Sequence, residues 1–185
     1  MKKLLALVLA LILTISLCAC SQSGGYELKA GAKKLNYGDK TTLDEFMKSF
    51  PDAEELGPGR YRINDGNAVI GFRFVDEDVV MVSGYSLLAG RLGDFKIGDD
   101  KEKIEKAFKD IEFDFSIPNV EVFFVDGEIM SRSDFSDKEI EVIKTHDTEK
   151  INELRNKTLL ISFRLDGDKI KQIFYGDYRF VIMGR

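Results

Sequence analysis

The sequence predicts an α+β fold of two tandem units, each a helix followed by a meander of antiparallel strands, with the helices packed on one face of the sheet. Two repeated patterns favour this fold. Gly-Asp pairs at 38–39 and 98–99 each precede an amphipathic stretch. The segments Ile70–Arg73 and Ile161–Arg164 have similar sequences, and each leads through an acidic turn into another apolar strand. Such internal similarity is typical of repeated structural units.

The amphipathic stretches 41–50 and 100–111 have the spacing of helices. Apolar residues recur three and four positions apart, so that they lie on one helix face. Pro51 ends the first stretch. Asp99 is expected to cap the second, with Glu102 completing a capping box.

Three acidic turns predict β-hairpins, at 76–78, 126–127 and 166–168. The second unit is longer because of an insertion at about 121–157. Within the insertion, 136–139 is suited to capping a helix and 148–155 has the pattern of a short helix. Residues 140–145 fit a helix or a strand, so the sequence does not decide between helix and strand for 136–157.

Residues 1–19 have the layout of a secretory signal peptide. Lys2 and Lys3 precede an apolar run that ends at Leu17 and is shorter than the roughly 20 residues needed to span a bilayer. The sequence Leu-Cys-Ala-Cys at 17–20 resembles a bacterial lipobox. The resemblance implies cleavage before Cys20 and a diacylglyceryl group on its sulfur. A plain signal peptide with an incidental cysteine is the alternative.

The domain organisation follows from these boundaries. Residues 1–19 are expected to be the lipoprotein signal peptide and residues 20–34 a lipid-anchored tether. The first helix-β unit then covers 35–94 and the second covers 95–185. The protein is expected outside the cell, on the outer face of the cell membrane.

The composition argues against several classes of function. The chain has 185 residues, a formal charge of −5, one histidine and two cysteines. An acidic chain is a poor nucleic-acid binder, and these few ligand residues leave little for a metal or nucleophile site. We expect no catalysis, no cofactor and no metal. Calcium binding at the acidic turns 76–78 and 166–168 is one alternative. A catalytic role for His146 with Asp147 is another, whereas the expected position of His146 is in a solvated loop.

Arginine is concentrated in the predicted strands, whereas the two expected helices at 41–50 and 100–111 carry only lysine. Side chains alternate between the two faces of a strand. This alternation places four arginines on the face away from the helices, and we take them as a candidate binding face: Arg62, Arg73, Arg164 and Arg179. Arginine is enriched in recognition surfaces, so this face is expected to bind a protein or an anionic envelope component. A solvated face with cross-strand ion pairs is the alternative.

Tandem helix-plus-meander units behind a lipobox resemble the β-lactamase-inhibitor-protein-like repeat and the small envelope lipoproteins of the outer-membrane-assembly type. The resemblance covers most of 35–185 and depends on the Gly-Asp pairs and the strand pairs with acidic turns. It implies a binding module and not an enzyme. We therefore expect a lipid-anchored envelope protein that binds or scaffolds through an open sheet face. A ligand- or solute-capturing lipoprotein and a carboxylate-dependent hydrolase are the alternatives.

Overall fold

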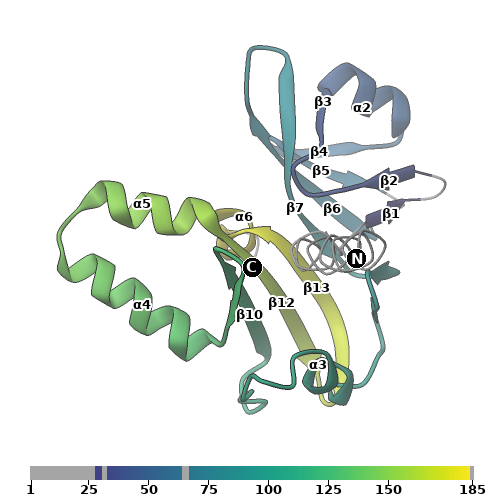
Figure 1. Ribbon diagram of the computed structural model, residues 1–185. Coiled ribbons are helices and arrows are strands. Elements are labelled where there is room, and N and C mark those ends of the chain that lie inside the picture. Colours follow the sequence, from purple (N-terminus) through teal and green to yellow (C-terminus); the bar gives the residue numbers. More distant parts are fainter. Residues whose placement is uncertain (1–27, 31–32, 64–66, 184–185) are drawn as a thin grey trace, which may run out of the picture.

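A large antiparallel sheet forms the centre of the structure (Figure 1). The computed structural model describes residues 28–30, 33–63 and 67–183. In spatial order the strands of this sheet are β11 (Glu128–Met130), β10 (Asn119–Val125), β12 (Thr158–Asp166), β13 (Lys169–Asp177), β7 (Val79–Leu87), β6 (Ala68–Phe74), β5 (Arg60–Ile63) and β4 (Glu54–Gly57). A ninth strand, β3 (Lys40–Thr42), pairs with β7.

A second sheet and five helices complete the described part of the chain. The small sheet has the order β2 (Lys33–Leu35), β1 (Leu28–Ala30), β8 (Arg91–Leu92) and β9 (Phe95–Lys96). The helices are α2 (Leu43–Ser49), α3 (Glu102–Ala107), α4 (Arg132–Lys144), α5 (Thr148–Lys157) and α6 (Tyr178–Met183). The α+β class and the antiparallel sheet are confirmed.

The two halves of the chain share one sheet because β7 pairs with β13. Residues 84–87 of β7 pair with 173–176 of β13, and residues 79–81 of β7 pair with β3. The three predicted acidic turns connect β6 to β7, β10 to β11 and β12 to β13. These hairpins are confirmed.

Helices cover both faces of the large sheet, so the prediction that they pack on one face is wrong. The α2 and α3 helices pack on the core that contains Ile161 of β12. The α4, α5 and α6 helices pack on a core that contains the neighbouring residue Leu160, which points to the opposite face. The physical reason is that β10, β12 and β13 carry buried apolar residues on both faces, and each face needs a cover.

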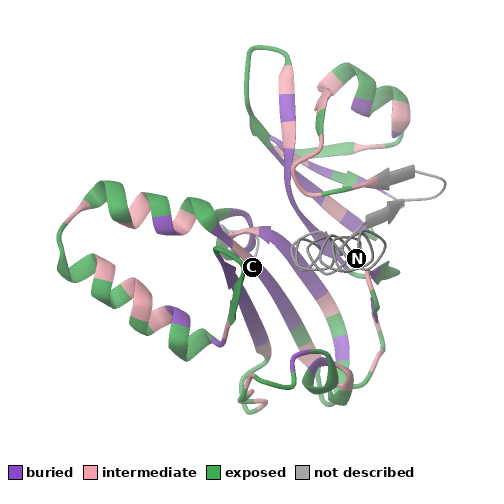
Figure 2. Ribbon diagram, viewed as in Figure 1, coloured by how far each residue is buried: buried purple, intermediate pink, exposed green. Residues whose placement is uncertain are grey.

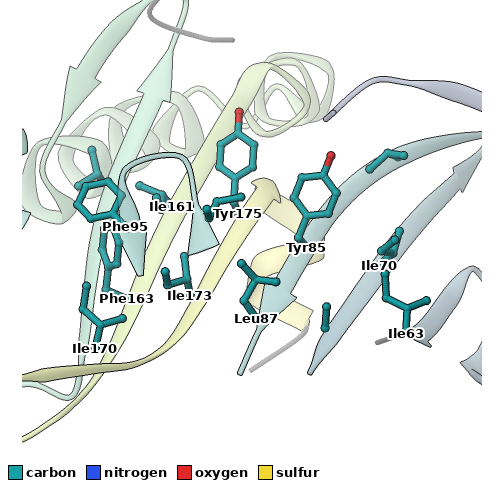
Figure 3. Close-up of a cluster of buried hydrophobic side chains, with 14 of the residues drawn as sticks. Ile63, Ile70, Tyr85, Leu87, Phe95, Ile161, Phe163, Ile170, Ile173 and Tyr175 are labelled. Atoms are coloured by element: carbon teal, nitrogen blue, oxygen red, sulfur yellow. The ribbon is translucent and has the colours of Figure 1, made fainter. Parts of the chain in front are cut away.

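The first core extends across the β7–β13 junction (Figure 3). Tyr85 and Tyr175 stack there with ring centroids 6.3 Å apart, and both rings are buried. Leu87 and Ile173 pair beside them and are also buried. A core that is shared in this way joins the two halves through apolar contacts as well as through backbone hydrogen bonds.

A glycine turn places the chain against β7 before the first helix. Gly38 has a φ of 84°, and Asp39 Oδ2 accepts a 2.8 Å hydrogen bond from Asn36 N. Gly38 N in turn donates to Val82 O at 2.9 Å. Thr42 then caps α2, and a capping box with Glu45 is present. Local sequence thus determines where this helix begins.

The same turn recurs before α3, and it docks on β13. Gly98 has a φ of 94°, and Asp99 Oδ2 accepts a 2.8 Å hydrogen bond from Lys96 N. Gly98 N donates to Ile170 O at 2.8 Å. Because Asp99 is used in this way, it does not cap α3. The helix instead begins after Lys101, which makes no side-chain cap, so the predicted capping box with Glu102 is wrong.

Within the expected insertion at 121–157, the first residues belong to β10 and β11, and residues 132–157 form a helical hairpin that projects from the sheet. The outer surface of this hairpin is mostly exposed (Figures 1 and 2). Ser131 caps α4 through a capping box with Asp134, and Asp147 caps α5. Residues 140–144 belong to α4, which resolves the open choice between helix and strand. His146 is exposed in the turn between the two helices and has a φ of 55°.

The C-terminal segment 178–183 is the helix α6, so the prediction that Arg179 lies in a strand is wrong. Asp177 Oδ1 accepts a 2.8 Å hydrogen bond from Phe180 N at the start of the helix. Phe180 and Val181 are buried together in the second core. Burial of two adjacent residues is incompatible with the alternation of a half-buried strand and fits a short helix that packs on the sheet.

Candidate functional site: an arginine-lined cavity on the sheet

Four arginines from separate elements line one cavity of about 420 Å³. The cavity lies on the face of β5, β6 and β7 where the ends of α5 and α6 also meet the sheet. Its lining consists of Pro58, Gly59, Arg60, Gly71, Phe72, Arg73, Phe74, Ser83, Arg155, Asn156, Asp177, Arg179 and Phe180. We call it the arginine cavity.

Strand pairing places Arg60 and Arg73 on the same face of the sheet. Arg60 of β5 pairs with Gly71 of β6, and Arg73 lies two residues beyond Gly71. Residues two apart in a strand point the same way. Arg60 is half-buried and Arg73 is exposed. The two guanidinium groups therefore come from neighbouring strands and point to one side.

The helices contribute the other two arginines. Arg155 lies near the end of α5, where its Nε and Nη2 both contact Glu139 Oε1 of α4, at 2.9 and 2.8 Å. Arg179 lies in the first turn of α6, and its Nη2 donates to Asn152 Oδ1 at 3.2 Å. Both arginines are thus oriented by contacts with the helical hairpin, and both reach the cavity.

Two glycines make room for the aromatic ring that forms one wall of the cavity. A Cβ on Gly71 or Gly84 would overlap ring carbons of Phe180. Only glycine at these positions allows the ring of α6 to lie directly on the strands. The guanidinium carbon of Arg60 is 5.8 Å from the centroid of the same ring, a cation–π distance.

Two of the four arginines have few polar partners within the described part of the chain. Arg60 Nε is buried there without a hydrogen-bond partner. Arg73 forms no ion pair with any described carboxylate. Arg60 Nε is closed off from the cavity, so Arg60 would meet a ligand through its terminal nitrogens. Arg73 is exposed, and its guanidinium group is available to an anion in the cavity.

Asp177 is the single carboxylate in the cavity lining. Burial raises the pKa of this carboxyl, whereas the hydrogen bond from Phe180 N and the charges of Arg73 and Arg179 act in the opposite direction. Four arginines against one aspartate give the lining a formal charge of +3, of which the ion pair between Arg155 and Glu139 offsets one unit. A positive, partly enclosed site in a protein of net charge −5 concentrates anions locally.

The four arginines proposed from the sequence do not all meet. Arg73 and Arg179 line the cavity, but Arg179 does so from a helix and not from a strand. Arg62 is exposed and pairs with Glu54 at 2.7 Å, as the solvated alternative expects. Arg164 is exposed on β12, where it pairs with Asn119 and Gln172 of the flanking strands, outside the cavity lining.

Sequence reasoning missed Arg60, Arg155, Asn156 and Asp177 as members of this site. The candidate residues were chosen from predicted strands. Nothing in the local sequence of α5 indicates that its end lines the same cavity as β6. The arginine-bearing face of β6 is partly covered, because α6 packs on it at Gly71. The site is a cavity between sheet and helices.

The other sequence candidates lack comparable geometry. No group of three or more His, Cys, Asp or Glu side chains within the described ranges is placed to hold a metal ion. A smaller cavity of about 220 Å³ lies beside Glu121, whose buried side chain is 3.4 Å from Arg132. Its lining has three carboxylates and one arginine, a formal charge of −2, so it is opposite in sign to the arginine cavity and is not suited to an anion.

Comparisons with protein-family models, with curated proteins and with solved structures find no match for this chain. Cys20 and the signal segment lie outside the described residues. Among the helices that are described, none is long and apolar enough to cross a bilayer.

Proposed function

We propose that this chain is a lipid-anchored protein of the cell envelope that acts as a non-catalytic binding module and takes an anionic ligand in the arginine cavity. The observation that carries the proposal is the convergence of Arg60, Arg73, Arg155 and Arg179 on one cavity of an acidic protein. Guanidinium groups recognise carboxylates and phosphates through paired hydrogen bonds.

Binding is favoured over hydrolysis by the chemistry of the cavity lining. Acid–base glycoside chemistry uses two carboxyl groups, and this lining contains only Asp177. The positive charge is instead supplied by arginines, which remain protonated and do not act as acids or bases near neutral pH. The site is suited to holding an anion.

The binding proposal is tested by removing two cavity charges and comparing with a matched control. Arg73→Gln/Arg179→Gln changes the cavity, whereas Arg62→Gln/Arg164→Gln removes the same charge from exposed positions outside it. Phosphate at constant ionic strength is expected to raise the melting temperature of the full-length protein and of the control pair, because a ligand that binds only the native state stabilises it. The rise in the cavity variant should be less than about half as large. Equal rises in all three proteins would contradict anion binding at this cavity.

The lipid anchor is tested separately. Cys20→Ala removes the sulfur that would carry the lipid, and we expect the protein to move from the membrane fraction to the soluble fraction. Two acyl chains anchor a protein stably, at about 0.8 kcal/mol for each buried CH₂. Cys18→Ala is the control and should leave the protein in the membrane fraction. If Cys20→Ala stays membrane-bound, the lipobox interpretation is wrong.

We also infer that 35–94 and 95–185 are related units. The inference is supported by the two equivalent turns, in which Gly38 and Gly98 donate to Val82 and Ile170 of corresponding strands. The pairing of Lys40 with Met81 has a counterpart in the bridge between Asp100 and Lys169.

A further inference from the structure

The arginine cavity has room for much more than one anionic group. Its volume is about 420 Å³, whereas a phosphate ion has the volume of two or three water molecules, roughly 60–90 Å³. Cavities of about 300–1,000 Å³ typically hold whole small-molecule ligands. Most of the space is therefore suited to a part of the ligand other than its charged group.

The lining indicates that this second part is apolar. Pro58, Phe74 and Phe180 line the cavity together with the arginines and have apolar side chains. Phe74 is 56% exposed although it is a large aromatic residue. A large exposed apolar side chain in the lining of a cavity is typical of a binding site.

The arginines indicate a doubly charged anion with several acceptor oxygens. Among the described residues Arg60 and Arg73 form no ion pair, and Arg179 donates to the neutral side-chain amide of Asn152. Asp177 is the one lining carboxylate that interacts with the charges of Arg73 and Arg179. A phosphate monoester carries about −1.5 to −2 charges at pH 7 and has three strong acceptor oxygens. This group complements a strongly positive lining better than a single carboxylate does.

We propose, on the basis of the function proposed above, that the cavity binds a phosphate monoester of an apolar alcohol. The phosphate group lies among the guanidinium groups of Arg60, Arg73 and Arg179, and the apolar group contacts Phe180 and Phe74. Such an ester occurs as the headgroup end of a phosphatidic-acid-type lipid or as a soluble aryl or alkyl phosphate. The recognition chemistry is the same for both sources.

The test uses 1-naphthyl phosphate, whose fluorescence anisotropy reports binding to the full-length protein in phosphatidylcholine nanodiscs. The protein has no tryptophan, so it interferes little with the naphthyl signal. Inorganic phosphate and 1-naphthol serve as competitors, the first representing the anionic half of the ligand and the second the apolar half. We expect the ester to bind at least about tenfold more tightly than either, because each half contributes separately to binding.

Three variants separate the two halves of the site. Arg73→Gln should weaken both the ester and inorganic phosphate by about tenfold, since it removes a charged hydrogen-bond donor. Phe74→Ser should weaken the ester by about tenfold and leave inorganic phosphate unchanged. Arg62→Gln is the matched control and should change neither, because this residue pairs with Glu54 outside the cavity.

The outcomes distinguish this inference from the proposed function. If inorganic phosphate competes as strongly as the ester binds, the apolar half is wrong and anion binding stands. If neither binds, or if Arg73→Gln binds both like the unchanged protein, both proposals are wrong. Once binding is seen, stronger competition by dihexanoyl phosphatidic acid than by octyl phosphate supports a lipid source. The reverse order supports a soluble ester.

Discussion

At the scale of single residues, Asp177 links the stability of the fold to the charge of the cavity. Its carboxylate accepts the hydrogen bond from Phe180 N that begins α6, and it lies near Arg73, Arg179 and Tyr37. Burial raises the pKa of this carboxyl above its ordinary value of 3.8. The folded protein therefore binds the proton more tightly than the unfolded chain does, and the corresponding stability is present below about pH 3.8 and lost as the pH rises through the folded pKa.

Asp177→Asn keeps an oxygen acceptor for Phe180 N and removes the carboxylate charge. We expect the variant to match the unchanged protein in free energy of unfolding near pH 2.5 and to be more stable at pH 7. Urea denaturation at both pH values measures this. The variant should also bind anions more tightly at pH 7, because the lining charge rises. A variant that is less stable at pH 7 would show that the carboxylate charge stabilises the fold.

At the scale of elements, the packing of α6 on the sheet depends on the absence of side chains beneath it. Gly71→Ala places a methyl group into the ring of Phe180, and we expect a loss of about 2 kcal/mol in the free energy of unfolding. Phe180→Ala alone should cost about 3 kcal/mol. The double variant should lose less than the sum by about 1 kcal/mol or more, because the overlap disappears with the ring.

The control for this cycle combines Phe180→Ala with Phe46→Leu. Phe46 of α2 belongs to the first core on the opposite face of the sheet, so the two costs should add within about 0.5 kcal/mol. Chemical denaturation of the five variants gives the coupling energies directly. Additive costs for Gly71→Ala and Phe180→Ala would mean that the ring does not rest on this glycine.

At the scale of the whole molecule, the β7–β13 pairing makes two halves into one folding unit. The first core includes buried residues of both halves, among them Tyr85, Leu87, Ile173 and Tyr175. We expect a single unfolding transition in urea, with far-ultraviolet circular dichroism and tyrosine absorbance giving the same midpoint. Leu87→Ala in the first half and Phe163→Ala in the second should each move the whole transition. Two separate midpoints would show that the halves unfold independently.

Local sequence predicted those features that depend on a few neighbouring residues. The acidic turns between strands, the helix that Thr42 begins and the short helix after Asp147 all have their signals within one turn of chain. The signal-peptide pattern of residues 1–19 is likewise local, and the lipid attachment to Cys20 that it indicates stays a prediction. The predicted cap of α3 at Asp99 was wrong because a carboxylate before a helix can either cap the helix or accept a hydrogen bond within the preceding turn. Asp99 accepts from Lys96 N within the turn.

Only the tertiary structure decided how the arginines are grouped. Arg73 of a strand, Arg155 at the end of α5 and Arg179 of α6 meet because α6 lies on Gly71 and Gly84 and α5 reaches the same place. Likewise, the apolar residues of 178–183 fit a strand or a helix until β6 and β7 supply a glycine surface for Phe180. Residue order determines turns and caps through contacts a few residues apart, whereas this cavity depends on contacts between segments about a hundred residues apart, which local sequence patterns do not specify.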